Sequence, residues 1–138
     1  MKIMLDTNII LDFYEDRGVQ TKYAKKIMVD FWEDGVDCFI TASQIKDLFY
    51  IKRKDDLKKL KEFSASLLND YNVVEINKKD VELALKSTGA DIEDMIIAFT
   101  SKRHELDYII TNNITDYKDS PVKAITSIEF IKMTEQNK

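Results

Sequence analysis

Short apolar runs alternate with helical stretches along the chain, and this alternation limits the fold more than any other feature of the sequence. The strand-like runs are residues 3–5, 36–41, 72–76, 108–111 and 122–125. The helical stretches are residues 8–17, 20–34, 44–52, 55–70, 78–88, 91–105 and 127–133. Strands that alternate with helices pair in parallel, because each helix carries the chain back along the sheet. We therefore expect an α/β fold with a mainly parallel central sheet of about four to five short strands.

Residues that favour helix ends set these boundaries. Gly18 and Gly35 are expected to terminate the first two helices, and Ser43 is expected to cap the helix over residues 44–52. In the helix over residues 91–105, one apolar face is predicted from the spacing of Ile92, Met95, Ile96 and Phe99. The order of the strands within the sheet does not follow from these signals.

The composition bounds the class of protein. A chain of 138 residues with 3 Gly and 1 Pro suits one domain, which we expect to span residues 1–138. No apolar run approaches the roughly 18 residues of a membrane span, so we expect a cytoplasmic protein with no membrane contact. The single cysteine, Cys38, cannot form an internal disulfide or a multi-cysteine zinc site, and its apolar surroundings predict a buried thiol.

Acidic residues gather where predicted strands end or helices begin. Open α/β sheets place their sites at the carboxyl ends of strands, so these positions are candidates for chemistry. Asp6 directly ends the first apolar run, while Asp91 and Asp94 lie three residues apart on one side of their helix. The complete set is Asp6, Asp47, Asp91, Glu93, Asp94 and Asp116.

Two interpretations of these acids are open. Helix capping or solvation explains any one of them alone. Capping explains the group less well, because a carboxylate that ends a buried strand lies near the core, where an unpaired charge is costly. A bound cation is the simplest compensation for several carboxylates. Oxygen ligands without nearby His or Cys suit Mg²⁺ or Mn²⁺ rather than Zn²⁺, and such a site indicates phosphoryl chemistry first.

Both halves of the chain resemble PIN-domain nucleases. Residues 5–12, which read LDTNIILD, resemble the amino-terminal motif of that family, and residues 91–94 and 107–117 resemble its carboxy-terminal half. The closest likeness is to small VapC-like toxins of type II toxin–antitoxin pairs. The resemblance implies a three-layer α/β/α domain and an endoribonuclease that hydrolyses RNA phosphodiester bonds with one or two Mg²⁺ or Mn²⁺ ions. It also implies an antitoxin partner and a homodimer.

The resemblance assigns roles position by position. The four acids of the family match Asp6, Asp47, Asp94 and either Asp116 or Asn113. The implied metal ligands are Asp6, Asp94, Asp116 and the accessory acid Asp91, while Asp47 would position the attacking water or a second ion. Residues that would orient these groups or the substrate are Thr7, Asn8, Ser43, Thr111 and Asn113. For Thr7 and Ser43, helix capping is an equally good explanation.

Two positions depart from the family pattern. The second acid is commonly Glu, and Asp47 is shorter by one methylene. Asn112 stands where Arg is frequent, which removes a phosphate contact. These departures support an alternative, a catalytically weakened PIN-like binding module that acts through protein or RNA partners. A phosphotransfer domain with Asp6 as nucleophile would need a second Asp two residues later, where this chain has Asn8.

The charge is unevenly distributed. The whole chain has a formal charge of −4, which argues against nonspecific coating of nucleic acid. Residues 46–62, however, hold 7 basic and 4 acidic side chains. A solvated helix pair with paired charges explains this segment, and a phosphate-steering surface beside the acidic site is the functional alternative. The candidates for RNA steering are Lys46, Lys52, Arg53 and Lys54.

Overall fold

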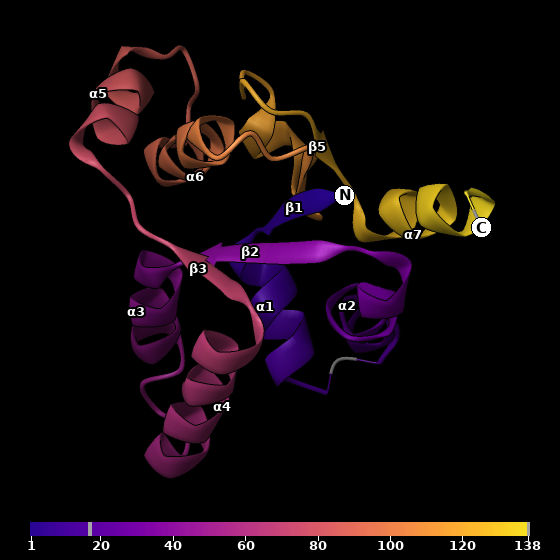
Figure 1. The fold of residues 1–138 in the computed structure, drawn as a ribbon. Helices are drawn as coiled ribbons and strands as arrows, with labels where there is room; N and C mark the ends of the chain where they lie inside the picture. Colours follow the sequence, from indigo (N-terminus) through magenta and orange to yellow (C-terminus); the bar gives the residue numbers. More distant parts are fainter. Residues whose placement is uncertain (17, 138) are drawn as a thin grey trace.

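A five-stranded parallel sheet forms the middle layer of the computed structural model, which describes residues 1–16 and 18–137 (Figure 1). Its strands are β1 (Lys2–Leu5), β2 (Asp37–Thr41), β3 (Asn72–Val74), β4 (Tyr108–Ile110) and β5 (Ala124–Ile125). Every neighbouring pair runs parallel, in the order β3-β2-β1-β4-β5. The expected parallel sheet is therefore confirmed.

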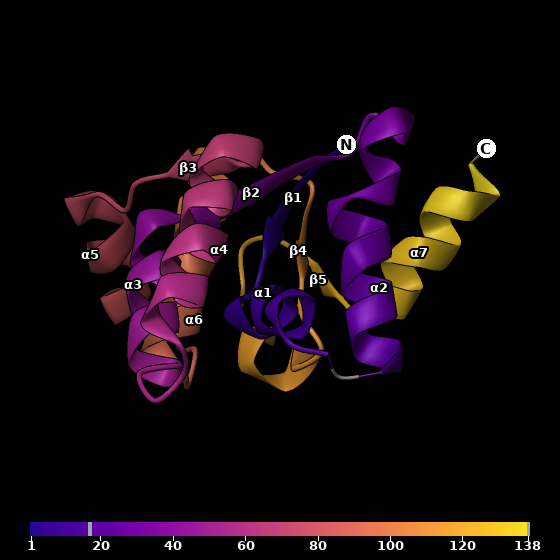
Figure 2. The same ribbon diagram turned by 90° about the horizontal axis from the view of Figure 1, so that it is seen from below.

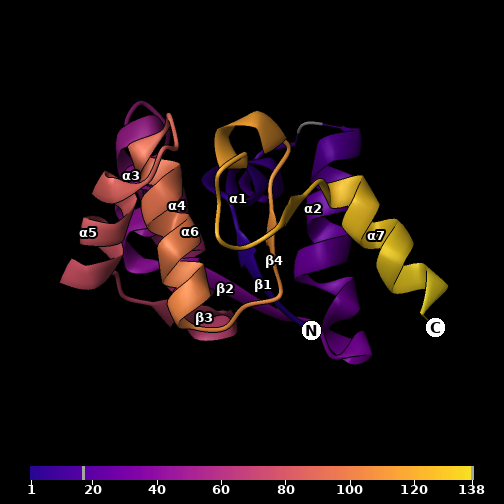
Figure 3. The same cartoon turned by 90° about the horizontal axis from the view of Figure 1, so that it is seen from above.

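Helices cover both faces of the sheet. They are α1 (Thr7–Tyr14), α2 (Val19–Met28), α3 (Ala42–Ile51), α4 (Leu57–Asp70), α5 (Lys78–Lys86), α6 (Ile92–Arg103) and α7 (Ser127–Gln136), with the 3-10 turns η1 (Asp30–Asp34) and η2 (Ile114–Tyr117). Figure 2 shows α1 to α4 in front of one face, and Figure 3 shows α5 and α6 in front of the other. In both views α7 lies beside α2. The ring of Phe130 in α7 packs against the ring of Phe31 in η1, with their centroids 6.1 Å apart. The expected α/β/α layers are confirmed.

The first strand contributes to the core on both faces of the sheet. Ile3 and Leu5 pack into the cluster beneath α1 and α2, while Met4 packs with Ile109 and Met95 on the side of α6. All five of these side chains are fully buried. A strand that is covered on both sides needs apolar residues at every position, which is why β1 lacks polar alternation.

The order of the strands reverses beside β1. After β1 the chain builds β2 and β3 on one side, and then it returns to place β4 and β5 on the other. The backbone N–H of Asp6 donates to the carbonyl of Ile110 at 2.9 Å, so the ends of β1 and β4 stay together. The carboxyl end of such a switch point is where α/β sheets bind ligands. Asp6 lies at that position.

The first two predicted helices have different ends in the structure. The helix expected over residues 8–17 ends at Tyr14, and position 17 lies outside the described residues. Gly18 does not terminate this helix but precedes α2, with a φ of 66° that favours glycine. The helix expected over residues 20–34 breaks at Val29 into α2 and η1. Gly35 ends η1 in the left-handed region, as expected for a terminator.

The predicted cap of α3 was wrong. Thr41 caps this helix, because its hydroxyl accepts from the N–H of Gln44 while the Gln44 side chain accepts from the N–H of Thr41. This reciprocal pair satisfies two backbone donors, whereas Ser43 already lies inside the first turn. Most other boundaries shift by a few residues, and the loop expected after β4 contains η2.

The predicted apolar face of α6 was only partly right. Met95 is fully buried, but Ile92 is 39% exposed, and the buried apolar side chains of the helix also include Ile97 and Ala98. The helix packs against Met4 and Ile109 of the sheet and also against α5, so its buried surface is wider than a single stripe. Cys38 is buried, as predicted. Within residues 1–16 and 18–137, no helix has the length and apolar character that a membrane crossing needs.

Candidate active site

Asp6 is a buried carboxylate with several hydrogen-bond donors. It ends β1 and caps α1, and only 6% of the residue is exposed. The N–H of Thr7 donates to Oδ1 at 2.8 Å, and the Thr111 hydroxyl donates to Oδ2 at 2.8 Å. Burial raises the pKa of Asp6, although these bonds oppose the shift. The side chain is therefore fixed in direction and costly to ionise.

Asp94 lies in the first turn of α6, and Asp91 caps that helix. Oδ1 of Asp91 accepts from the N–H of Asp94 at 3.0 Å, which places both acids at one helix end. The pKa of Asp94 rises to about 7 through burial first, and then through the negative charges of Asp6 and Asp91. Three acids from two elements thus repel one another at the carboxyl edge of the sheet.

A fourth acid, Asp116, approaches from η2. The side-chain amide of Asn113 donates to Oδ2 of Asp116, and the N–H of Asn113 donates to the Thr111 hydroxyl at 3.0 Å. Asn113 therefore orients a carboxylate, while Thr111 links the same loop to Asp6. One carboxylate oxygen from each of three residues lies within 4.8 Å of the others. These three residues are Asp91, Asp94 and Asp116.

Tyr117 was not among the predicted site residues, yet it joins two of the acids. Its hydroxyl lies 3.2 Å from Oδ1 of Asp6 and 3.3 Å from Oδ1 of Asp94. The residue is buried, and both burial and the two neighbouring carboxylates raise the pKa of its phenol. One hydroxyl has one hydrogen, so Tyr117 can donate to only one of these oxygens at a time. The local signal was its place directly after Asp116.

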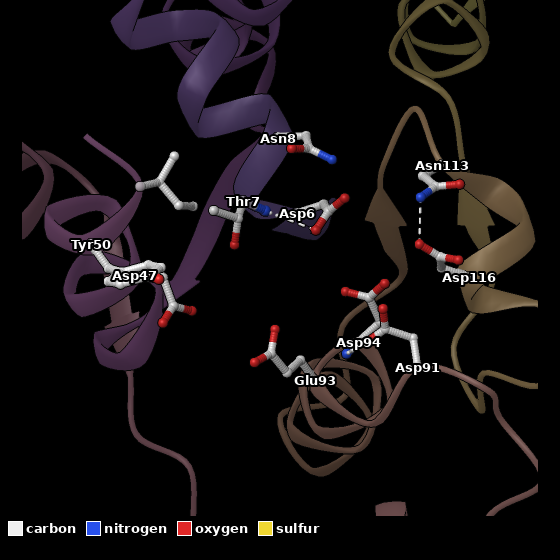
Figure 4. A pocket seen from close by; sticks show the side chains of 11 residues that line it. Asp6, Thr7, Asn8, Asp47, Tyr50, Asp91, Glu93, Asp94, Asn113 and Asp116 are labelled. Carbon is white, nitrogen blue, oxygen red and sulfur yellow. Dashed lines mark hydrogen bonds between the residues drawn. The ribbon is translucent and has the colours of Figure 1, made fainter. Parts of the chain in front are cut away.

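These acids open onto a cavity of about 390 Å³ (Figure 4). Its wall includes Asp6, Thr7, Asn8, Asp47, Tyr50, Ile51, Asp91, Glu93, Asp94, Asn113 and Asp116. Asp47 and Tyr50 come from α3, across the cavity from Asn113 and Asp116. Asp47 is exposed and stands apart from the close group of three acids. Glu93 also lines the cavity and points its carboxylate into the space toward α3.

The other predicted orienting residues have different positions. The backbone N–H of Thr7 donates to Asp6, and the Thr7 hydroxyl accepts from the side-chain amide of Gln44 at 3.3 Å. Gln44 also donates to the carbonyl of Leu5 at 2.7 Å and so ties α3 to the end of β1. Asn8 lines the cavity as an exposed side chain. Ser43 contacts the Thr41 hydroxyl at 2.9 Å and lines a neighbouring hollow with Asp47.

Asn112, which stands where the family often has Arg, makes two hydrogen bonds through its side chain. Its side-chain amide donates to Gln20 at 3.2 Å, and its oxygen accepts from the N–H of Ser127 at 3.4 Å. It therefore links the loop after β4 to the starts of α2 and α7.

Two of the four basic candidates have side-chain contacts with other residues. Lys52 forms an ion pair with Glu15, and Arg53 lies over the ring of Tyr50 with its guanidinium carbon 4.3 Å from the ring centroid. Lys46 and Lys54 are exposed. Of the four residues, Arg53 thus contacts a side chain of the cavity wall, whereas Lys52 pairs with Glu15 just after α1.

The donor set suits a hard divalent cation. Every charged side chain on the cavity wall is a carboxylate, and the wall contains no His or Cys. Asp91, Asp94 and Asp116 offer oxygens close enough to share an ion, and a cation would relieve the repulsion that raises the pKa of Asp94. The residues present therefore fit Mg²⁺ or Mn²⁺.

The sequence model of the PIN domain matches residues 2–115. The chain belongs to the PIN domain family. A relative named Ribonuclease VapC1, from Aquifex aeolicus (strain VF5), is 23% identical to this PIN domain over 134 residues, which cover 94% of this chain and 92% of the relative. The resemblance inferred from the motifs at both ends of the chain is confirmed.

Solved structures share the fold of this PIN domain. A toxin–antitoxin complex from Klebsiella pneumoniae gives a TM-score of 0.66 at 22% identity, over 91% of this chain and 97% of that chain. VapC20 from Mycobacterium tuberculosis, a sarcin-ricin loop cleaving toxin, gives a TM-score of 0.66 at 9% identity, over 86% of this chain and 95% of that chain. The three-layer architecture is therefore shared by proteins of low sequence identity.

Proposed function

We propose that this PIN domain is a divalent-metal-dependent endoribonuclease. The observation that carries the proposal is the approach of one oxygen each from Asp91, Asp94 and Asp116 to within 4.8 Å, with Asp6 joined to Asp94 through Tyr117. Four carboxylates at a topological switch point are costly without a cation, and they are the ligands that Mg²⁺ and Mn²⁺ prefer. A relative that bears the name ribonuclease supports RNA as the substrate.

Asp91, Asp94 and Asp116 would hold the principal ion, and Asp6 would reach it from the end of β1. When bound, the metal would lower the pKa of a coordinated water and offset negative charge on the phosphate. Thr111 and the N–H of Thr7 hold Asp6 in one orientation, and Asn113 does the same for Asp116. These bonds reduce the rearrangement that binding requires. The site would hold one or two ions.

The other side of the cavity would handle the attacking water. Asp47 and Glu93 face the space between α3 and α6, where a carboxylate can accept a proton from water or hold a second ion. Glu93, which lines the same two cavities as Asp47, would supply the longer carboxylate on this side. The domain would span residues 1–138 and act in the cytoplasm.

We also propose that the chain is the toxin of a toxin–antitoxin pair. The support is the shared fold with a toxin–antitoxin complex and the likeness over 92% of Ribonuclease VapC1. Free ribonuclease activity would then slow growth, and an antitoxin protein would relieve it. A homodimer stays a prediction from the family resemblance.

Cleavage of labelled RNA tests the proposal. The parent protein should cut RNA in Mn²⁺ or Mg²⁺ and lose activity in EDTA, while Asp94→Asn should lose at least about a hundredfold in rate. Asp37→Asn is the matched control, because Asp37 is an exposed acid at the amino end of the sheet. Equal activity of the parent and Asp94→Asn would exclude this site. Metal-dependent binding without cleavage would favour the weakened binding module instead.

A further inference from the structure

Tyr50 is an exposed aromatic side chain on the wall of the acidic cavity. The residue is 69% exposed, although it lies in the last turn of α3, only three positions after Asp47. Residues three apart lie on the same side of a helix, so Tyr50 and Asp47 face the same space (Figure 4). Neither metal binding nor the packing of the core uses this ring.

Arg53 holds one face of that ring. Its guanidinium lies 4.3 Å from the ring centroid, and its Nη1 donates to the backbone carbonyl of Tyr50 at 2.7 Å. The second contact anchors the cation to the end of α3, so the stack is preorganised. Because the residue remains 69% exposed with Arg53 in place, most of the remaining ring surface is accessible to a ligand.

A ring and a guanidinium beside a phosphodiester-cutting centre match a nucleotide. Aromatic rings and Arg planes both stack on unpaired bases, and every base offers a π-face. Arg53 also supplies positive charge next to a ring on the wall of an otherwise acidic cavity. An apolar peptide would make no use of this charge.

We propose that Tyr50, backed by Arg53, is a stacking platform for one unpaired base of the RNA adjacent to the bond that is cut. The proposal rests on the proposed ribonuclease function and narrows its substrate class to single-stranded RNA or an unpaired loop. Bases inside a duplex are already stacked, so a paired segment cannot use the platform without opening.

Steady-state cleavage of a single-stranded RNA tests the platform. Tyr50→Leu should raise KM about tenfold and leave kcat within about twofold, because stacking adds binding shared by the substrate and the transition state. Tyr50→Phe keeps the ring and should match the parent. Trp32→Leu is the matched control, since Trp32 is another exposed aromatic that lies outside this cavity.

An abasic scan locates the base. In the parent, removal of one particular base near the cut should raise KM by the same factor as Tyr50→Leu. The same abasic RNA should cost Tyr50→Leu nothing further, since the two changes delete one contact. Independent, additive penalties would overturn the platform.

Binding separates this inference from the proposed function. Labelled single-stranded RNA should bind Asp94→Asn about tenfold more tightly than Asp94→Asn/Tyr50→Leu, and duplex RNA should not distinguish them. If the parent cuts no RNA, the proposed function fails, and this comparison alone decides on the platform. Equal affinities of the two variants for single-stranded RNA overturn the platform. If Asp94→Asn/Tyr50→Leu then also binds an antitoxin protein more weakly than Asp94→Asn, Tyr50 belongs to a protein interface.

Discussion

The hydroxyl of Tyr117 lies 3.3 Å from Oδ1 of Asp94, although the two residues are 23 positions apart in the chain. The same hydroxyl reaches Asp6, so one buried phenol connects η2, α6 and the end of β1. Donation to either acid stabilises the ionised form of that acid, which is the form that binds a cation. The Tyr117 hydroxyl therefore opposes the rise in the pKa of both carboxyl groups, of which burial is the largest cause.

Tyr117→Phe should weaken Mn²⁺ binding while the fold is kept. The ring still fills its place in the core, but the loss of a hydrogen bond to charged groups should raise Kd about tenfold at neutral pH. Calorimetric titration at several pH values measures this, and the difference should shrink at high pH. An unchanged Kd would show that the hydroxyl has no such role. Tyr23→Phe, in α2, is the control.

In the metal-free protein, Asp94 should contribute less and less to stability as pH rises from about 4 to 7. Asp94 has a pKa of about 7 in the folded chain against an ordinary 3.8, so the folded state binds more protons than the unfolded state in that window. The free energy of unfolding then falls as pH rises through it. Urea unfolding of the parent and of Asp94→Asn at several pH values isolates this contribution. A difference in the free energy of unfolding that does not change with pH would contradict the prediction.

Metal affinity should have the opposite pH dependence. Protons compete with the cation for Asp94, so the apparent Kd for Mn²⁺ should rise as pH falls below about 7, approaching tenfold per unit for one proton. Titration calorimetry in two buffers of different protonation enthalpy would measure the released proton. Binding that is independent of pH would mean that Asp94 is not a ligand.

Asp80→Ala should destabilise the chain by about 3 kcal/mol, because it leaves the Arg103 guanidinium without its buried partner. Asp80 is 1% exposed and accepts from Nε and Nη2 of Arg103, which link α5 to the end of α6. Burial alone would raise the pKa of Asp80, yet the bonds from Arg103, Asn77 and Thr100 hold it below its ordinary value. Urea unfolding measures the effect. Glu82→Ala, which removes the exposed i,i+4 pair with Lys78, should change little.

Gly89→Ala should disturb the site from the loop before α6. A Cβ at this position would lie 2.4 Å from Cγ and 2.5 Å from Sδ of Met95, whose side chain is fully buried. The clash should cost about 1–3 kcal/mol and displace Asp91, so Mn²⁺ affinity should fall together with stability. Thermal unfolding and metal titration check both effects. A stable variant with parental affinity would show that the loop adjusts freely.

Three acids of the site, Asp6, Asp91 and Asp94, are predictable from their immediate neighbours in the sequence. Asp6 ends an apolar run, and Asp91 and Asp94 sit at helix-start spacing, so both features are visible in a few neighbouring residues. The contacts of Tyr117 and Gln44 join residues that are far apart in sequence, and they depend on a strand order that apolar runs do not encode. Thr41 was recoverable, since Thr41 and Gln44 have capping-box spacing. Ser43 lies directly before the expected helix, so the local sequence alone predicts it as the cap.

The place of the metal itself tests the central claim most directly. Crystals grown with Mn²⁺ should give an anomalous-scattering peak between the carboxylates of Asp91, Asp94 and Asp116, and Asp94→Asn crystals should lack it. Manganese bound elsewhere, or a peak that survives Asp94→Asn at full height, would contradict the account of this acidic cluster as the catalytic metal site.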